Sequence, residues 1–325
     1  MKDFIKNSVV SLIFFVVVIT VVLLWTNAHI ELLKINWIYF IIACFLFLFS
    51  VFIWLISWAY LIRKRSSVSY NNLFIIGFSS LYGALTPVQF GAEALRSMKL
   101  KSFFKIPYNE SISSSMIVKG TKFIILAIFF IFILMFFISK AELSSVMFFA
   151  LFSGFFVIAV AVLFFVLPLS RRCNLVITSF FRFLSKNIPL FAYFEKFFVA
   201  YSVNLRNLTL NSFMIVFAIS IVSYLFEFLA FNFCFSSVGV LIDFVPLLVL
   251  FVVISVLERT PFLPRGIGLV EFVGLTFLSI PWFVNESLSL PEIGAVLIVF
   301  DFVRLVIPTI FSLIIGAVFR IEIRE

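Results

Sequence analysis

Charged residues interrupt long apolar stretches of this chain at several places, and their spacing limits the chemistry that they can do. Glu93 and Arg96 are three residues apart, as are Asp301 and Arg304, so each pair lies on one face of a helix. A charge in an apolar environment is costly unless it is paired or hydrogen-bonded. We therefore expect each pair to form either a structural ion pair or part of a polar wall that binds a ligand; for Asp301 and Arg304, a proton path is a further alternative.

The first pair follows a break in a helix. Pro87 ends the incoming helix, and Gly91 permits a tight backbone before a new helix begins. Glu93 then falls in the first turn of that helix, where a carboxylate also complements the helix dipole. Thr86, beside the proline, is an accessory candidate for the same polar wall.

A second broken segment, residues 257–271, holds two prolines, two glycines and four charges. Backbone amides at the start of the helix after Gly268 are suited to a phosphate, with Arg259 or Arg265 alongside. Glu271 would hold one of these arginines in place. The alternative is a turn that is stabilised by Glu–Arg pairs.

Three further charges stand inside apolar stretches. Glu227 is alone in its stretch, so it is either functional or the partner of Arg304 or Lys122 from another helix. Lys119 and Lys122 stand where another apolar stretch begins. We expect these two side chains to snorkel toward the membrane surface.

Several kinds of active site are excluded by residue counts. His29 is the only histidine, which removes Ser-His-Asp triads, HExxH zinc sites and histidine proton relays. Cys44, Cys173 and Cys234 lie far apart and form no CxxC pair, which argues against disulfides and a zinc site. We assign no catalytic residue, metal or cofactor.

The composition predicts a membrane protein. Of the 325 residues, 64% are apolar and 12% charged, whereas a soluble domain has about 45–50% and about 25%. The net charge of +9 fits loops that contact anionic lipid headgroups, so we expect no nucleic-acid partner.

The apolar stretches predict an all-α, polytopic integral membrane bundle. The expected spans are residues 8–26, 37–62, 71–87, 121–139, 143–167, 210–235, 244–257, 268–280 and 291–319. Residues 71–87 and 244–257 are short and end at Pro/Gly-broken turns, which favours two re-entrant broken-helix hairpins. A weakly amphipathic stretch at about 171–208 predicts interfacial helices.

Positive charges predict the orientation. Seventeen of the 24 Lys and Arg residues fall in residues 1–7, 63–105, 171–209 and 320–325. Because positive residues collect on the inner side, both termini are expected in the cytoplasm of a plasma-membrane protein. We expect a single membrane domain, residues 1–325, whose halves 1–140 and 141–325 form an inverted repeat as a working hypothesis.

Two of these motifs carry a resemblance to a known family. Thr86-Pro87 followed by Gly91, Glu93 and Arg96 resembles the TPxxxGxExxR signature of the flippase-like, lysylphosphatidylglycerol-synthase transmembrane-region family. Pro264 to Glu271 is similar to its PGGxGxxE, and Arg304, Pro308 and Gly316 are similar to its closing R…P…G. The resemblance implies a polytopic lipid-handling protein, related to the flippase half of aminoacyl-phospholipid synthases or to proteins of polyisoprenoid-linked sugar pathways.

The chain also departs from the family pattern. Arg265 replaces a usual glycine, and residues 118–122 stand where an acidic-Arg pair is common. The chain ends at Glu325 without a soluble aminoacyltransferase domain, so the synthase reaction is not expected.

We therefore expect a translocator of a lipid or lipid-linked sugar in cell-envelope biogenesis, and not an enzyme. Its partner would be a membrane phospholipid or a polyprenyl-phosphate-linked glycan. The residues expected to bind the headgroup are Glu93, Arg96, Arg259, Arg265, Glu271, Asp301 and Arg304, with Glu227 and Thr86 as accessories. The alternatives are a polyprenyl-phosphate-dependent membrane glycosyltransferase and a non-transporting partner of a glycosyltransferase or lipid synthase.

Overall fold

The structure, a computed structural model, is all-α over the part of the chain that it describes. That part comprises residues 2–85, 91–140, 155, 156, 158–160, 163, 165, 167–186, 188, 190–258, 264–280 and 288–319. These residues form helices and turns, with no strand among them. The predicted fold class, an all-α membrane bundle, is confirmed.

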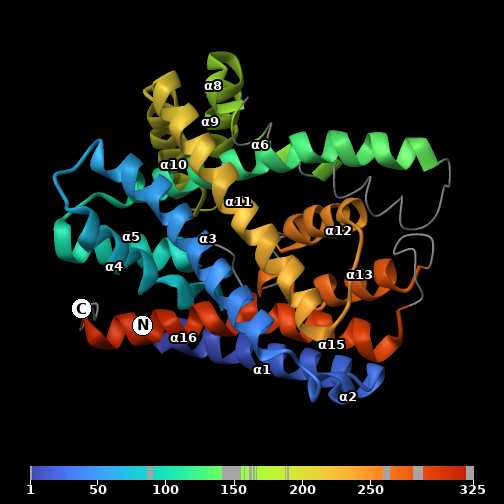
Figure 1. Cartoon of the computed structure of the whole chain (residues 1–325). Coiled ribbons are helices and arrows are strands. Elements are labelled where there is room, and N and C mark those ends of the chain that lie inside the picture. The colour runs from blue at the N-terminus through green and yellow to red at the C-terminus, as the bar shows by residue number, and fades with distance from the viewer. Residues whose placement is uncertain are drawn as a thin grey trace.

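The helices follow each other with short connections (Figure 1). The N-terminal half contains α1 (Lys2–Thr26), α2 (His29–Leu32), α3 (Trp37–Arg63), α4 (Tyr70–Phe78), the 3-10 turn η1 (Leu81–Leu85), α5 (Gly91–Phe104) and α6 (Tyr108–Lys140). The C-terminal half contains α8 (Leu167–Leu169), α9 (Arg171–Ser185), α10 (Leu190–Arg206), α11 (Leu210–Val238), α12 (Phe244–Leu257), the 3-10 turn η3 (Pro264–Gly266), α13 (Leu269–Leu278), α15 (Leu290–Asp301), the π turn η4 (Phe302–Val306) and α16 (Ile307–Val318).

Within the described residues, four helical stretches are long and apolar enough to cross a membrane. They are Trp37–Arg63, Tyr108–Ile131, Leu210–Val238 and Leu290–Val318. The last is the expected span 291–319, which contains the π turn η4. Arg304 lies in this turn, and Asp301 directly precedes it. The expected span 143–167 falls largely outside the described residues.

Several helix bounds differ from the predicted spans: α1 begins at Lys2 and not at residue 8, α4 ends at Phe78 and not at residue 87, and the largest difference is at the start of α6. The helix that was expected to begin at residue 121 is α6, which begins at Tyr108 and includes a polar turn rich in serine. These serines are buried, and the hydroxyl of Ser114 donates to the carbonyl of Glu110 at 2.9 Å. Bonding within the helix lets small polar residues extend it into the protein interior.

The central pair of helices is α3 and α11, which pack along each other for much of their length (Figure 1). The α6 helix runs along one edge of the bundle, and α1 runs along the opposite edge with α15 and α16. Where α1 crosses α15, Gly294 allows Thr26 a close approach that a Cβ would block. The start of α1 and the end of α16 lie on the same side of the molecule.

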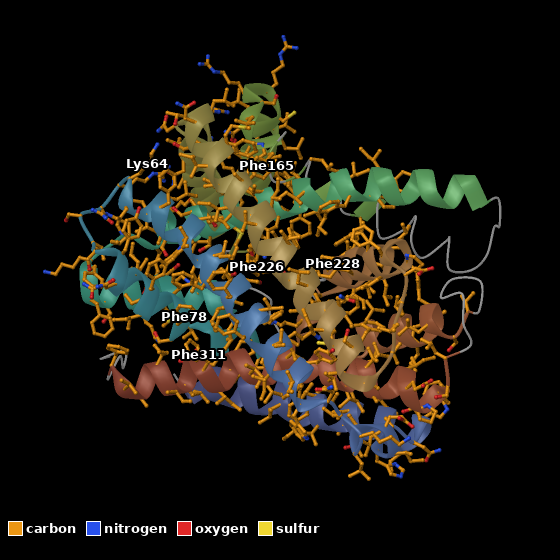
Figure 2. The ribbon with its side chains drawn as sticks, viewed as in Figure 1. Lys64, Phe78, Phe165, Phe226, Phe228 and Phe311 are labelled. Carbon is orange, nitrogen blue, oxygen red and sulfur yellow. The ribbon has the colours of Figure 1, made fainter. Side chains whose placement is uncertain are left out.

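Phenylalanine side chains join these helices. Phe78 on α4 meets Phe311 on α16 edge to face at 5.2 Å between ring centroids (Figure 2). Phe228 on α11 meets Phe251 on α12 in the same way at 5.4 Å. Such pairs add stabilisation beyond the apolar area that they bury, so aromatic bulk holds α12 against the central pair.

Two short helices lie in the interior of the bundle. The α12 helix is buried over most of its length but spans about 21 Å, and α13 about 15 Å, against about 30 Å of hydrocarbon. Neither reaches across a bilayer by itself. The 3-10 turns η1 and η3, which belong to the two broken segments, pack against each other. Re-entrant hairpins and an inverted repeat remain predictions.

Candidate functional site

A small cavity lies where the two broken segments meet. Its volume is about 130 Å³. The side chains that line it come from α3, η1, α5, α6 and α11 and from the segment that follows α12. Six of them are charged: Glu93, Lys119, Lys122, Glu227, Glu258 and Arg265. Charges from the two halves of the chain therefore share one interior space.

Two ion pairs bridge helices on the α6 side of the cavity. The Lys119 ammonium lies 2.8 Å from a carboxylate oxygen of Glu93 on α5, and the Lys122 ammonium lies 3.3 Å from Glu227 on α11. Lys119 and Lys122 are three residues apart, so α6 presents both on one face. Phe165 packs against Gly120 between them, where a Cβ would clash with the ring.

The snorkelling that was expected of these lysines is wrong. Lys122 is 8% exposed and its ammonium also lies over the Tyr224 ring. The prediction for Glu227 is confirmed for one of its two alternatives, since this carboxylate pairs with Lys122. Each lysine points toward a carboxylate of another helix, which neutralises both charges inside the bundle.

Arg96 lies behind the same side of the cavity, next to two tryptophan rings of α3. Its guanidinium carbon is 4.9 Å from the Trp54 ring centre and 4.6 Å from that of Trp58. The side chain is completely buried. Among the described residues, no hydrogen-bond acceptor reaches any of its three guanidinium nitrogens. Trp54 touches both Arg96 and the cavity.

Arg304, which is also completely buried, has the opposite surroundings. Its guanidinium donates to Asp301 at 2.7 Å, to Glu258 at 3.0 Å and to Glu271 at 3.0 Å. It also donates to the backbone carbonyl of Arg265 at 2.9 Å, while the Arg265 side chain donates to the carbonyl of Arg304. This Arg304 network ties α13, α15 and the two ends of the second broken segment together.

The backbone of the second broken segment takes conformations that suit glycine. Gly266 has a φ of 69°, and a Cβ at this position would lie 2.6 Å from the carbonyl oxygen of Leu257. Gly268 has a φ of 89°, and its amide donates to the Glu271 carboxylate at 2.5 Å. The expected phosphate site at the start of this helix is therefore wrong for that amide, because a carboxylate of the chain already binds it.

No set of three or more His, Cys, Asp and Glu side chains within the described ranges has the arrangement of a metal site. Of the acidic side chains here, Glu258, Glu271 and Asp301 all bind the Arg304 guanidinium.

Comparison with known protein families shows to which family this chain belongs. The sequence profile described as "Lysylphosphatidylglycerol synthase TM region" matches residues 8–312, nearly the whole chain. The chain belongs to the lysylphosphatidylglycerol synthase transmembrane-region family. No curated protein and no solved structure matches it. As a member of this family, the chain is a membrane protein of lipid-related biogenesis.

The structure distributes the predicted site residues of this family member over three environments. Glu93, Arg265 and Glu227 line the cavity. Glu271, Asp301 and Arg304 form the buried network next to it, and Arg96 lies behind Trp54. Arg259 and Thr86 lie outside the described residues.

Among the charged residues of the cavity wall of this family member, sequence reasoning missed three: Lys119, Lys122 and Glu258. The signal for the lysines was their spacing of three residues, together with two carboxylates, Glu93 and Glu227, that need partners in apolar surroundings.

Proposed function

We propose that this protein moves a phospholipid or a lipid-linked sugar across the membrane, with the headgroup passing through the charged cavity. The observation that carries this proposal is the cavity itself, whose charged wall is built by both halves of an apolar bundle. Such charges are costly in a membrane interior and usually mark a substrate or ion pathway. Two broken helical segments that meet in the interior are typical of transporters.

The cavity in this structure is small for the proposed substrate. Its volume of about 130 Å³ compares with about 300–1,000 Å³ for sites that enclose small molecules. A headgroup can enter only after the wall widens. The ion pairs of Lys119 with Glu93 and of Lys122 with Glu227 each join two helices at this wall. Exchange of these pairs for contacts with a headgroup is our proposed opening step.

The proposed headgroup wall is made of Glu93, Lys119, Lys122, Glu227, Glu258 and Arg265. Arg304, Asp301 and Glu271 position Glu258 and Arg265 through the Arg304 network. Arg259 and Thr86 stay in the proposal on their sequence positions. We treat residues 1–325 as one membrane domain with both termini in the cytoplasm, which the common side of the start of α1 and the end of α16 supports.

The test is a headgroup-resolved translocation assay. The purified protein is placed in liposomes with fluorescent phosphatidylglycerol or a polyprenyl-phosphate sugar, and the label in the outer leaflet is followed after reduction. We expect Lys119→Gln to slow translocation of the preferred lipid at least tenfold, because it removes the ammonium that passes from Glu93 to the headgroup in the proposed opening step. Lys101→Gln, which changes an exposed lysine at the end of α5, is the matched control and should translocate at the native rate.

Two results would contradict the proposal. One is no translocation of either lipid class above protein-free liposomes. The other is native-rate translocation by folded Lys119→Gln protein.

A further inference from the structure

Around Arg96 lie buried hydrogen-bond donors that no acceptor in the described part of the chain reaches. The three guanidinium nitrogens of Arg96 and the indole nitrogens of Trp54 and Trp58 are buried, and no acceptor among the described residues reaches them. Most buried donors in proteins are paired, and a buried donor without an acceptor costs about 1–3 kcal/mol. These five nitrogens, three on the guanidinium and two on the neighbouring indole rings, indicate a place for a ligand that brings several acceptor oxygens.

Among the described residues, Glu93 has one carboxylate oxygen without a hydrogen-bond donor there. Glu93 lies one helical turn before Arg96, and one of its oxygens is bound to Lys119 while the other lacks a hydrogen-bond donor among the described residues. A single oxygen cannot serve five nitrogens. The guanidinium carbon lies over the Trp54 and Trp58 rings, and these cation–π contacts use none of its N–H groups.

Charge separates the two sides of the cavity. Among the described residues, the α5–α6–α11 side of the cavity wall, taken together with Arg96 behind it, has three cations and two carboxylates: Arg96, Lys119, Lys122, Glu93 and Glu227. The Arg304 side has two cations and three carboxylates: Arg265, Arg304, Glu258, Glu271 and Asp301. The first side therefore has one surplus positive charge and the second one surplus negative charge. A phosphodiester carries one negative charge, so it matches the first side and is repelled by the second.

We infer that the Arg96 side of the cavity is a phosphate-binding subsite, with Arg96 as its anion anchor and Trp54 as the wall between it and the cavity. The inference deepens the proposed function, on which it rests, because it assigns the phosphate of the headgroup to α5 and α6 and not to Arg304. Arginine binds phosphate oxygens through two parallel hydrogen bonds, which fits a guanidinium whose nitrogens receive no acceptor from the described residues. The same chemistry would bind free phosphate.

The test measures binding without transport. The full chain in neutral detergent at fixed ionic strength is titrated calorimetrically with three probes: dihexanoyl phosphatidylglycerol, dihexanoylglycerol and inorganic phosphate. We expect the phosphate-bearing lipid to bind at least tenfold more tightly than the phosphate-free lipid. A tenfold change corresponds to about 1.4 kcal/mol, within the range of one charged hydrogen bond. Inorganic phosphate that binds as tightly as the phospholipid would identify free phosphate as the ligand of this subsite.

Variants connect the binding to Arg96. Arg96→Gln should weaken phosphatidylglycerol binding at least tenfold and leave dihexanoylglycerol binding unchanged. Arg63→Gln is the matched control, because Arg63 also lies over an aromatic ring, that of Tyr70 at 4.5 Å, but is exposed at the end of α3. If Arg96→Gln does not fold, Arg96→Lys keeps the charge and should weaken binding severalfold, since an ammonium lacks the planar fork.

Equal binding of the two lipids by the native protein, or native binding of phosphatidylglycerol by folded Arg96 variants, would overturn the inference. If the native protein bound the lipids as expected but translocated neither lipid class, the proposed function would be contradicted and the phosphate-binding subsite would be retained.

Discussion

Arg96 and Arg304 are both completely buried, one in each half of the chain, and their surroundings are opposite. Arg304 has carboxylates of Asp301, Glu258 and Glu271 within 3.0 Å. The Arg96 guanidinium carbon lies within 4.9 Å of the ring centres of Trp54 and Trp58, and no acceptor in the described part of the chain reaches its nitrogens. The described residues thus satisfy the guanidinium of Arg304 and offer no hydrogen-bond acceptor to that of Arg96.

This difference in hydrogen bonding indicates a structural role for Arg304 and a ligand-binding role for Arg96. Buried charges stay in a protein when they are paired, and Arg304 is paired more than once. An arginine that keeps its charge in a buried place without hydrogen bonds is costly, so a folding role alone does not account for Arg96. We therefore expect substitutions of Arg304 to damage the fold first and those of Arg96 to damage ligand binding first.

The largest stability effect is expected from Arg304→Gln. Removing this guanidinium leaves three carboxylates next to each other in an apolar interior, and breaking a buried pair costs about 3–5 kcal/mol. Thermal unfolding and size-exclusion chromatography in detergent measure the loss. A variant with the melting temperature of the native protein would show that the network contributes nothing to stability.

Arg96→Met should distinguish the role of Arg96 from that of Arg304. The variant loses two cation–π contacts, each about 1–2 kcal/mol, but it also removes a desolvated charge, so the net loss of stability should be below half that of Arg304→Gln. Lipid translocation should nevertheless fall at least tenfold. Melting temperature and translocation rate are measured on the same preparation. A melting temperature as low as that of Arg304→Gln would contradict our distinction.

Breaking the ion pair between Lys122 and Glu227 should have an effect on stability of intermediate size. Lys122→Met and Glu227→Gln, alone and together, form a double-mutant cycle across α6 and α11. Contacting charged residues show coupling energies of about 0.5–3 kcal/mol, and we expect the middle of this range because both side chains are largely buried. Additive effects on unfolding would mean that the 3.3 Å contact carries no energy.

Much of the fold could be predicted from the pattern of apolar residues. Residues 244–257 form α12 as expected, and α3 and α11 lie within one to three residues of their predicted bounds. The start of α6 could not be predicted from hydropathy, because its first turns are polar. Their serines satisfy the helix carbonyls and pack in the interior, and only the tertiary structure shows that this part is buried.

The site could be predicted only where partners are close in the sequence. The spacing of three residues predicted Asp301 as a partner of Arg304. Glu258 and Glu271 are far from Arg304 in the sequence, and only the tertiary structure brings them to it. The same limit explains the wrong prediction for Lys119, whose partner Glu93 lies on another helix. A lysine at the end of an apolar stretch gives no local sign of whether it faces lipid or a carboxylate of a neighbouring helix.

The smallest effect should come from Arg182→Gln. Arg182 lies 2.9 Å from Glu195, a distance as short as those in the Arg304 network, but its side chain is 70% exposed. Exposed ion pairs contribute about 0–1 kcal/mol, because water and salt screen them. The melting temperature in detergent should therefore stay near that of the native protein. The Arg182–Glu195 pair and the Arg304 pairs have similar distances but differ in burial. If Arg182→Gln lowered the melting temperature as much as Arg304→Gln, the distance between the charges, and not their burial, would determine how much a guanidinium–carboxylate pair stabilises this protein.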